Sequence, residues 1–459
     1  MSIYNITDFT TLKQEFNVHK NDKLEYGEIH TSFAFITKML NLFDQSVFMD
    51  ATKTWLDIGA GQGYFSIVLF NLLNTGLAPL MPNERERKTH IVEKMLYMVE
   101  IKESNCLALK SMFGEKANIV QTDFCLYDDT KLYDYIIGNP PYNSHGMKKV
   151  PTNKEKRKIQ DGTTSWTTFI TKSLSLLKPI TGKLCVIIPS IWLKPDKCNM
   201  YGLLTQYKIE KLHCLTSSQT NTLFRGEAQT PTCFFLLTKV KTDTILSLYD
   251  SKQKSYVNFT HSMGKPIPVF GSHIIQKMRK WLEKVGHLIV HKTNMPSVKS
   301  KFIESPYNPL YPYVNITSCV LEGLQPVLLI NYSDIPQAFY GIKKLVLAHK
   351  MYGFPYRDTN GTYGISNRDN YVITNNNEHH LKQLQQFLST KFALYLFEST
   401  RYRMKYLEKY AFEFIPDITK IDDFPTVITD DTVTDFFGLD EQDKKHILEL
   451  HKKKYMQFL

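Results

Sequence analysis

The sequence predicts an α/β protein with a doubly wound, mostly parallel sheet, followed by a region of mixed α+β structure. Between residues 54 and 142, short apolar runs with strand character alternate with helical patterns, and glycines, acids or an asparagine follow the runs. Alternation of this kind is typical of parallel sheets that carry helices on both faces. From residue 266 onward the alternation is lost, and strand-like pieces lie among helices and long polar loops.

Length and composition set the first limits on what the chain can be. It has 459 residues with 42% apolar content, which is enough for a large core and two domains. We expect a first domain at 1–240, a polar connection at 241–265 and a second domain at 266–459. No run of about 18 apolar residues is present, so we expect no membrane span.

Charge and cysteine content favour an intracellular protein with a polyanionic partner. The net charge of +11 suits a nucleic-acid partner, although it suits a merely soluble basic protein equally well. The seven cysteines include no C-x-x-C pair, so we expect a reducing compartment and no zinc site. The first residues lack the basic and apolar regions of a signal peptide, and we therefore expect a protein that is not secreted.

The first element that the pattern predicts is an amphipathic helix capped by Thr31 or Ser32. Its apolar side chains recur at helical spacing through Phe35, Ile36, Met39, Leu40 and Phe43. Taken alone, this stretch is an ordinary capped helix with no special role.

A short strand, Trp55 to Ile58, then runs into a loop with glycines at every second position. Gly59, Gly61 and Gly63 permit a tight turn and a close backbone approach to a ligand, and Asp57 lies just before them. The spacing differs from the G-x-G-x-x-G dinucleotide fingerprint. We therefore expect a nucleoside with a charged amino-acid tail as the ligand of this loop.

Two further strands end in acids. The strand at 95–101 ends with Glu100 and Ile101, where such folds hydrogen-bond a ribose diol. The alternative for Glu100 is a structural carboxylate that the next helix N-terminus favours through its dipole. The strand at 117–121 is followed by Asp123 and Phe124, which could accept from an adenine amino group and cover its ring.

The fourth strand ends abruptly in Asn139-Pro140-Pro141-Tyr142. Proline has no N–H for a strand ladder, so the two prolines predict a rigid turn at the carboxyl edge of the sheet. That edge is where open α/β folds bind ligands. The predicted turn presents a carboxamide, backbone carbonyls and an aromatic ring.

The remaining elements are predicted from apolar runs and helical spacing. Residues 76–90 are a polar insertion, and a helix at 166–177 precedes strands at 184–188, 209–215 and 230–238. In the second domain we expect helices at about 379–397 and 439–458.

Two segments are rich in cations. The first follows Tyr142 and has no apolar periodicity, which predicts either a phosphate-contacting loop or a solvated charge run. Its cations are Lys148, Lys149, Lys154, Lys156, Arg157 and Lys158. The second, 399–410, alternates basic residues such as Arg401 and Arg403 with tyrosines. It predicts either a nucleic-acid surface or a helix whose tyrosines pack inward.

The residues at the strand ends suit one reaction type. The nitrogen lone pair of an adenine or cytosine amine is delocalised, and acceptors for its two hydrogens make the nitrogen more nucleophilic. The oxygen of Asn139 and the carbonyl of Pro140 could accept both, Pro141 stiffens the turn, and Tyr142 could stack on the base. A methyl sulfonium donor would suit Asp57 through its ammonium group, and the reaction needs no metal.

These residues resemble the successive motifs of the gamma-class S-adenosylmethionine-dependent N6-adenine DNA methyltransferases. The matching segments lie between residues 25 and 240: Glu25–Leu40, Asp57–Gly63, Glu100, Asp123-Phe124, Asn139–Tyr142 and Gly182–Trp192. Ser32 replaces a proline that is usual in this family, and the 43 residues from Asp57 to Glu100 are more than usual.

The resemblance implies a Rossmann-like class I methyltransferase fold, S-adenosyl-L-methionine as cofactor, and a flipped adenine in double-stranded DNA as substrate. The family includes both stand-alone and restriction-modification enzymes, so the resemblance leaves open whether a separate cognate endonuclease is a partner, and we expect a monomer. Phe224 would be a second aromatic against the base. The implied cofactor residues are Tyr26, Thr31, Asp57, Gly59, Gly61, Glu100, Ile101, Asp123, Phe124 and Asn139.

Other acceptors remain open from the residues alone. Asn-Pro-Pro-Tyr turns also occur in enzymes that methylate cytosine N4, RNA adenine N6 or protein glutamine. A non-catalytic DNA-binding protein of the same fold is a further alternative.

Overall fold

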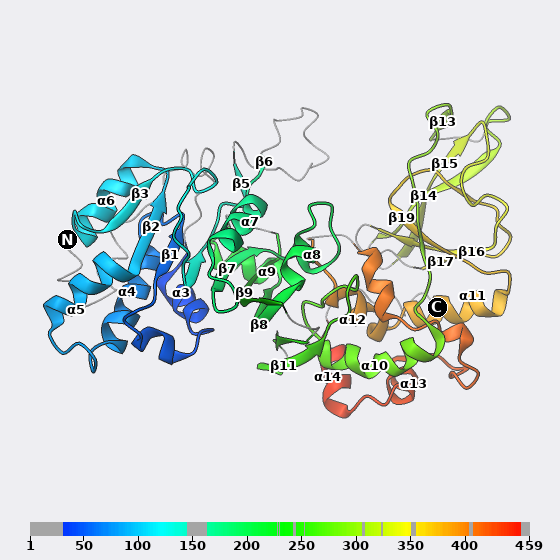
Figure 1. Cartoon of the computed structure of the whole chain (residues 1–459). Coiled ribbons are helices and arrows are strands. Elements are labelled where there is room, and N and C mark those ends of the chain that lie inside the picture. Colours follow the sequence, from blue (N-terminus) through cyan, green and yellow to red (C-terminus); the bar gives the residue numbers. More distant parts are fainter. Residues whose placement is uncertain are drawn as a thin grey trace. The chain divides into compact units, whose positions relative to one another are not determined.

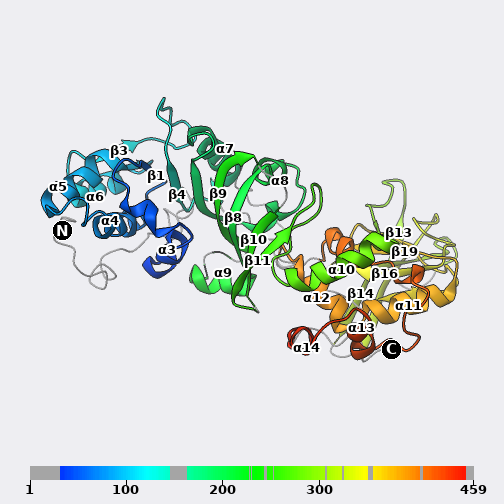
Figure 2. The ribbon, with the colours of Figure 1, turned by 60° about the horizontal axis from the view of Figure 1, so that its bottom comes forward.

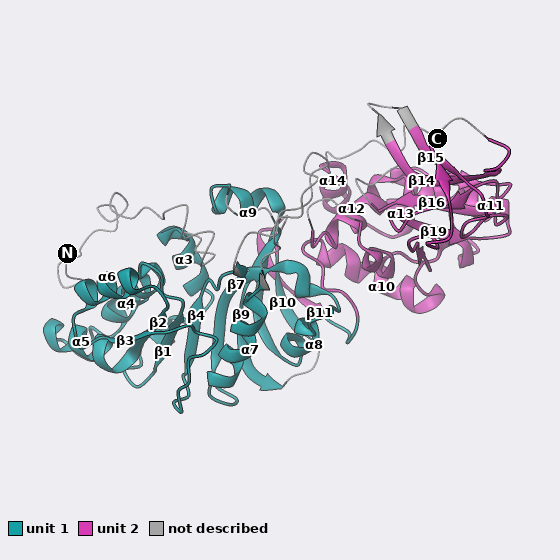
Figure 3. Cartoon of the chain, turned by 90° about the horizontal axis from the view of Figure 1, so that it is seen from above, with its two compact units in different colours: residues 1–249, 260–264 teal, residues 250–259, 265–459 magenta. Residues whose placement is uncertain are grey.

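The chain folds into two compact units, residues 1–249 with 260–264 and residues 250–259 with 265–459 (Figure 3). The structure is a computed structural model. The residues that it describes are 31–144, 163–226, 228, 230–241, 245–251, 253–304, 308–322, 325–349, 355–403 and 407–450.

Within the described residues, the largest sheet has nine strands, in the order β11-β10-β8-β9-β7-β4-β1-β2-β3 (Figure 1). Strands β3, β2, β1, β4 and β7 pair in parallel, and β9 is antiparallel to both β7 and β8. The predicted doubly wound, mostly parallel sheet is therefore confirmed. The strands are β1 (Trp55–Ile58), β2 (Leu96–Glu100), β3 (Asn118–Gln121), β4 (Tyr135–Gly138), β7 (Lys183–Pro189), β8 (Tyr207–Leu215), β9 (Thr232–Lys241), β10 (Ile245–Asp250) and β11 (Ser255–Thr260).

Helices cover both faces of this sheet, so that its central strands are buried along their whole length. For example, α8 and α9 both pack against β8 and lie on opposite faces of the sheet (Figures 2 and 3). The helical segments are α3 (Phe33–Leu40), η2 (Gln45–Met49), α4 (Tyr64–Gly76), α5 (Glu84–His90), η3 (Ile91–Met95), α6 (Glu103–Phe113), α7 (Trp166–Leu176), η4 (Ser190–Leu193), α8 (Met200–Thr205) and α9 (Ser217–Leu223).

The order of the strands reverses beside β1. β1 pairs with β2 on one side and with β4 on the other, with Trp55 opposite both Leu96 and Tyr135. Helical crossovers leave in opposite directions at such a switch point, and a crevice opens at the carboxyl ends of the two strands. The sheet therefore places the residues after Ile58 and Gly138 next to one another.

Three details differ from the sequence-based expectations. Ser32 occupies the N-cap position of α3, but neither it nor any other side chain caps this helix. The polar insertion contains helix α5, capped by the side chain of Asn83, and Arg87 hydrogen-bonds to Asn74 and to the Met81 carbonyl. Residues 241–265, expected as a connection, carry β10 and β11, the outermost strands of the sheet.

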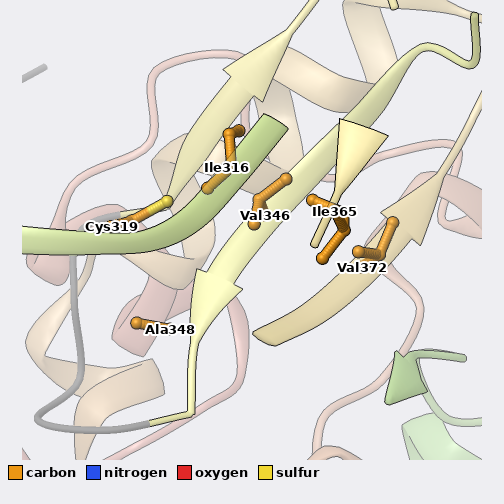
Figure 4. Packing of buried hydrophobic residues seen from close by; sticks show 6 residues of the cluster. All are labelled: Ile316, Cys319, Val346, Ala348, Ile365 and Val372. Atoms are coloured by element: carbon orange, nitrogen blue, oxygen red, sulfur yellow. The ribbon is translucent and has the colours of Figure 1, made fainter. Parts of the chain in front are cut away.

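The second unit has the predicted mixed α+β composition. Two four-stranded sheets are described, in the orders β12-β19-β16-β17 and β13-β15-β14-β18. A cluster of buried side chains joins them, with Ile316 and Cys319 of β14 beside Val346 of β16 and Val372 of β19 (Figure 4). The strands are β12 (His291–Lys292), β13 (Phe302–Ile303), β14 (Tyr313–Glu322), β15 (Gln325–Ser333), β16 (Lys344–Ala348), β17 (Tyr356–Asp358), β18 (Gly364–Ile365) and β19 (Asn370–Thr374).

The helices of the second unit correct two predictions. The single helix expected at 379–397 is two helices, because the Thr390 side chain caps the second one by accepting from the Ala393 N–H. In the segment 399–410, residues 400–403 and 407–408 are not helical, and Tyr402 is fully buried. The helical segments are α10 (Ser272–Val285), α11 (Glu378–Leu388), α12 (Lys391–Ser399), η5 (Lys409–Phe414), η6 (Ile418–Lys420), α13 (Asp430–Phe436) and α14 (Glu441–Leu448).

Among the described residues, we find no helix that combines the length and the apolar character needed to span a membrane.

Candidate active site

The candidate site lies at the carboxyl ends of β1, β2 and β4. Two short strands, β5 (Asn143–Ser144) and β6 (Thr163–Thr164), pair just beyond β4. Gly138, the last residue of β4, has φ of 152°, and a Cβ there would lie 2.8 Å from the Ile58 Cγ1 atom of β1. Only glycine fits this position, because a Cβ atom would overlap the Ile58 side chain.

Asp57, one residue before the end of β1, is a buried carboxyl with an incomplete set of partners. The Ser66 hydroxyl of α4 donates to its Oδ2 atom at 2.7 Å, and Oδ1 has no partner among the described residues. Burial raises the pKa of Asp57 to about 7, the Ser66 hydrogen bond opposes the rise, and the charge of Glu100 adds to it. A cation at this position would restore the ordinary ionised form.

The glycine loop after β1 has the conformation that its sequence predicts. Gly59, Gly61 and Gly63 have φ angles of 92°, 54° and 88°, which disfavour other residues. The N–H groups of Gly59 and Ala60 both donate to the Val99 carbonyl of β2, so the loop is fixed to the neighbouring strand. Gly59 itself is exposed, and a Cβ there would meet only Phe169, at 4.0 Å.

Glu100 serves as an anchor at the end of β2. Its carboxylate accepts from the Gly61 N–H at 2.7 Å, the Lys102 N–H at 2.8 Å and the Asn105 side chain at 3.3 Å. It therefore holds the glycine loop and lies beside the start of α6, as the structural alternative predicted. The ribose role stays a prediction. Ile101 follows with 45% of its surface exposed, an apolar side chain at the same edge.

The residues after β3 are held by local and aromatic contacts. The Asp123 carboxylate accepts from the Cys125 N–H at 2.8 Å. The Phe124 ring is buried, with the Phe169 ring of α7 at 5.1 Å and the Tyr127 ring at 6.2 Å. Phe124 thus belongs to an aromatic cluster that Phe169 of α7 and Tyr127 complete, and its contact with adenine stays a prediction.

Asn139 follows β4, and its carboxamide is oriented by one hydrogen bond. Its Nδ2 atom donates to the Thr31 hydroxyl oxygen at 3.0 Å, and Thr31 is buried just before α3. The Oδ1 atom is also buried and has no partner among the described residues. A buried acceptor without a donor is costly, and such groups concentrate where a ligand supplies the missing partner.

Tyr142 and Phe224 form an aromatic pair near this carboxamide's turn. Their ring centroids are 6.4 Å apart at 87°, so the structure brings together the two aromatics that the resemblance named. The Tyr142 hydroxyl has no partner among the described residues, and burial raises the pKa of this phenol well above its ordinary value. Tyr142 therefore stays neutral, and its stacking role stays a prediction.

The predicted nucleic-acid contacts fall in two groups. Lys148, Lys149, Lys154, Lys156, Arg157 and Lys158, together with the cofactor candidate Tyr26, lie outside the described residues. Arg401 donates to both carboxylate oxygens of Glu398 at 2.9 and 2.8 Å, and Arg403 lies 3.5 Å from Glu408. An intramolecular carboxylate therefore neutralises each of these two arginines.

Sequence reasoning missed the residues that support the site. Ser66 bonds Asp57, Asn105 bonds Glu100, and Ser165 bonds the Pro141 carbonyl. A serine in the first turn of a helix that follows a strand-end acid is a usable signal for Ser66. Ser165 has no local signal, since it lies 24 positions from its partner.

Among the described residues, no group of three or more His, Cys, Asp or Glu is arranged to hold a metal ion.

A mostly parallel sheet of this order, with acids at the ends of β1 and β2 and an Asn-Pro-Pro-Tyr turn after β4, is typical of class I methyltransferases. Residues 81–220 match the model of the Eco57I restriction-modification methylase family. The match confirms the resemblance to restriction-modification methylases.

Individual relatives are more distant. A tRNA1(Val) (adenine(37)-N6)-methyltransferase of a Flavobacteriaceae bacterium (strain 3519-10) is 30% identical over 115 residues, which are 25% of this chain and 48% of that protein. The chain thus spans about half the length of this curated relative.

Two solved structures align with parts of the chain. The Type IIL restriction-modification enzyme MmeI, in complex with DNA, aligns over 86% of this chain and 69% of its own at 12% identity and a TM-score of 0.47. The type I restriction-modification methyltransferase subunit from Streptococcus thermophilus aligns over 56% and 53% at 16% identity and a TM-score of 0.35.

Proposed function

We propose that the protein is a site-specific DNA methyltransferase that moves a methyl group from S-adenosyl-L-methionine to N6 of a flipped adenine in duplex DNA. The observation that carries the proposal is the Oδ1 atom of Asn139, a buried acceptor without a partner among the described residues, at a turn beside the switch point. The family match of residues 81–220 supports the same reaction class.

The carboxamide supports an amine as the acceptor group. Thr31 engages the Nδ2 atom of Asn139, so the oxygen is the atom left for a ligand, and an oxygen selects an N–H donor. Asn139 and the Pro140 carbonyl would accept the two hydrogens of the amine, and Tyr142 would stack on the base. A base inside a duplex must leave the stack to reach such a turn.

The residues at the other strand ends fit the implied cofactor. The Oδ1 atom of Asp57 lacks a partner among the described residues and lies beside the glycine loop, where it would bind the ammonium group of the methionine part. Glu100 and Ile101 would hold the ribose, and Asp123 and Phe124 would hold the adenine. When bound, the cofactor supplies an electrophilic methyl group on a sulfonium.

We assign DNA recognition to the second domain, 266–459, and cofactor binding to residues 1–240. The chain's net charge of +11 supports a polyanion as substrate. The cations between Lys148 and Lys158 are our candidates for phosphate contacts, since they follow the acceptor turn in sequence. Arg401 and Arg403 are weaker candidates, because their charges are paired with Glu398 and Glu408.

A second candidate is an RNA adenine-N6 methyltransferase. The observation that favours it is the similarity to a tRNA1(Val) (adenine(37)-N6)-methyltransferase over 115 residues. The site chemistry is the same for both substrates, because only the exocyclic amine meets Asn139. Cytosine N4 or a protein glutamine would also present an N–H donor to this carboxamide.

The test is methyl transfer to competing acceptors. Purified protein is incubated with labelled S-adenosylmethionine and equal amounts of duplex DNA, single-stranded DNA, total tRNA and protein, with the Asn139→Ala variant as control. We expect label in duplex DNA as N6-methyladenine, and single-molecule sequencing should locate it within one sequence motif. Label confined to tRNA would favour the second candidate, whereas label in protein or cytosine would overturn both.

A further inference from the structure

The Asn139–Tyr142 turn has an unusual shortage of internal hydrogen bonds. Pro140 and Pro141 carry no N–H, so the turn cannot hold its own carbonyl groups as an ordinary turn does. The Tyr142 hydroxyl, which could have fixed the ring from its far end, has no partner among the described residues. The orientation of the Tyr142 ring therefore depends on backbone contacts and on packing against Phe224.

One residue from another segment supplies the missing donors. The Ser165 hydroxyl donates to the Pro141 carbonyl at 2.7 Å, and the Ser165 N–H donates to the Tyr142 carbonyl at 3.3 Å. These two carbonyls flank the Tyr142 Cα atom. Because both are held by one residue, the direction in which the Tyr142 side chain leaves the backbone is fixed.

The Ser165 side chain does not cap helix α7, although serine at this position usually would. Ser165 occupies the N-cap position of α7, where serine hydroxyls usually accept from a backbone N–H of the first turn. Here the side chain makes no cap hydrogen bond, and only the Ser165 carbonyl opens the helix, accepting from the Thr168 N–H at 3.0 Å. Removal of the hydroxyl should therefore affect the turn without weakening α7.

Ser165 also joins the turn to two neighbouring structures. Directly before it, Thr164 pairs with Asn143 in the β5–β6 ribbon, and Asn143 follows Tyr142. One turn of helix later, Phe169 packs its ring 5.1 Å from that of Phe124, the residue expected to cover the cofactor adenine. Ser165 thus connects the Asn139–Tyr142 turn to the β5–β6 ribbon and to helix α7, which carries Phe169.

We propose that Ser165 is a positioning residue for methyl transfer, which holds the Pro141 and Tyr142 carbonyls so that the Tyr142 ring is presented to the acceptor base. It acts through Tyr142 and touches neither substrate nor cofactor. The kinetic part of the proposal rests on the proposed function, and the structural part does not.

The decisive variant is Ser165→Ala, and Ser173→Ala is its matched control. Ser173 lies on the same helix, and its buried hydroxyl donates to the Phe169 carbonyl at 2.8 Å, so the control also loses one serine-to-carbonyl hydrogen bond. At saturating cofactor and DNA, we expect the single-turnover rate of Ser165→Ala to fall about tenfold, which is what one well-formed hydrogen bond can supply. The dissociation constant for the cofactor should stay within about twofold of wild type, because the hydroxyl is bonded to the turn.

A double mutant shows whether the effect passes through Tyr142. If it does, adding Ser165→Ala to Tyr142→Ala should lower the rate no further than Tyr142→Ala alone. Additive losses, or an equal loss in Ser173→Ala, would overturn the proposal.

A spectroscopic measurement keeps the inference independent of the reaction. With 3-fluorotyrosine placed at position 142, we expect one narrow ¹⁹F resonance in wild type and Ser173→Ala, and a broadened or split resonance in Ser165→Ala. An unchanged resonance in Ser165→Ala would overturn the positioning role even in an active enzyme. If wild type methylates none of the acceptors, the proposed function fails, and the ¹⁹F result alone decides the role of Ser165.

Discussion

Two buried aspartates, one in each unit, have opposite surroundings. Asp57 is fully buried at the end of β1, accepts one hydrogen bond from Ser66, and has one oxygen without a partner among the described residues. Asp358, 3% exposed in β17, accepts from the buried ammonium of Lys344 at 2.6 Å and from the backbone N–H groups of Thr362 and Tyr363.

The difference is between a carboxylate that stabilises the fold and one that has an acceptor atom left for a ligand. Lys344 completes its own set by donating to the carbonyls of Phe339 and Ile342, both at 3.1 Å, so every charge of this pair is compensated within the fold. Asp57 lacks such compensation, and burial raises its pKa to about 7. A buried carboxylate with an unsatisfied oxygen at a strand end is therefore the feature that distinguishes the candidate site. Burial does not distinguish it, because both aspartates are buried.

The largest expected effect is on catalysis at the unpaired carboxamide. Asn139→Ala should abolish detectable transfer while cofactor affinity and thermal stability change little, because the carboxamide makes one hydrogen bond, to Thr31, and its Oδ1 atom has no partner among the described residues. Transfer assays, titration calorimetry and thermal melting check the three parts. Persisting transfer would show that the acceptor group has been assigned to the wrong residue.

The paired aspartate should behave in the opposite way. Lys344→Met removes one partner of a buried ion pair and should lower the free energy of unfolding of the second unit by about 3–5 kcal/mol. The double variant Lys344→Met with Asp358→Leu also removes the carboxylate that would be buried without a partner. It should recover much of the lost free energy of unfolding. Chemical denaturation followed through Trp281, which lies in the second unit, measures both. If Lys344→Met were as stable as wild type, the ion pair would not stabilise the second unit, and the proposed difference between the two aspartates would be wrong.

The raised pKa of Asp57 predicts a pH-dependent cofactor affinity. Below pH 7 the carboxyl is largely protonated and neutral, and a cationic ammonium binds the ionised form better. The affinity should therefore fall as pH decreases, to about one tenth at pH 6 of its value at pH 8. Calorimetry across this range should show the trend in wild type and a flat, weaker profile in Asp57→Asn. The same slope in the variant would assign the titration to another group.

A smaller effect is expected at the hydroxyl that orients Asn139. Thr31→Val keeps the side-chain shape and removes the 3.0 Å hydrogen bond to Nδ2, so the carboxamide loses its fixed orientation. The rate should fall about fivefold, within the range for one neutral hydrogen bond. Thr31→Ser, which keeps the hydroxyl, is the control. Equal rates in both variants would mean that this bond does not orient Asn139.

The smallest effect is expected in the second unit, at a cation that is already paired. Arg401→Ala should change the affinity for duplex DNA by less than about twofold, because the guanidinium is committed to Glu398. Fluorescence anisotropy at two salt concentrations measures the affinity. A strong loss with a reduced salt dependence would instead place Arg401 on the phosphate backbone.

The sequence predicted the centre of the fold well because its signals are local. Strand β1 begins and ends where the apolar run does, and β4 ends at the residue before Asn139, because prolines and glycines interrupt strands whatever the surroundings. The glycine loop follows from the same rule. These elements carry the strand-end residues, so local sequence patterns are enough to locate the candidate site along the chain.

What escaped prediction depends on contacts between distant positions. The break between α11 and α12 needs Thr390 to cap a helix in the middle of an apolar pattern, which helical spacing cannot distinguish from continuation. Strand β10 was overlooked in a polar stretch although Leu246 and Leu248 alternate with more exposed residues, a period that marks a strand. Arg401 and Glu398 are three positions apart in the sequence, a separation at which side chains meet on a helix. Their ion pair at the end of a helix could therefore have been predicted.

The acceptor turn has a consequence for the order in which the chain becomes competent. Its carbonyls are held by Ser165, 24 positions later, and its carboxamide by Thr31, 108 positions earlier. Contacts across such separations close loops at an entropic cost, so we expect the turn to take its final shape late in folding. During synthesis on the ribosome, Asn139 emerges before the serine that supports its turn. The newly made sheet centre can therefore exist, for a time, as a scaffold that is not yet an enzyme.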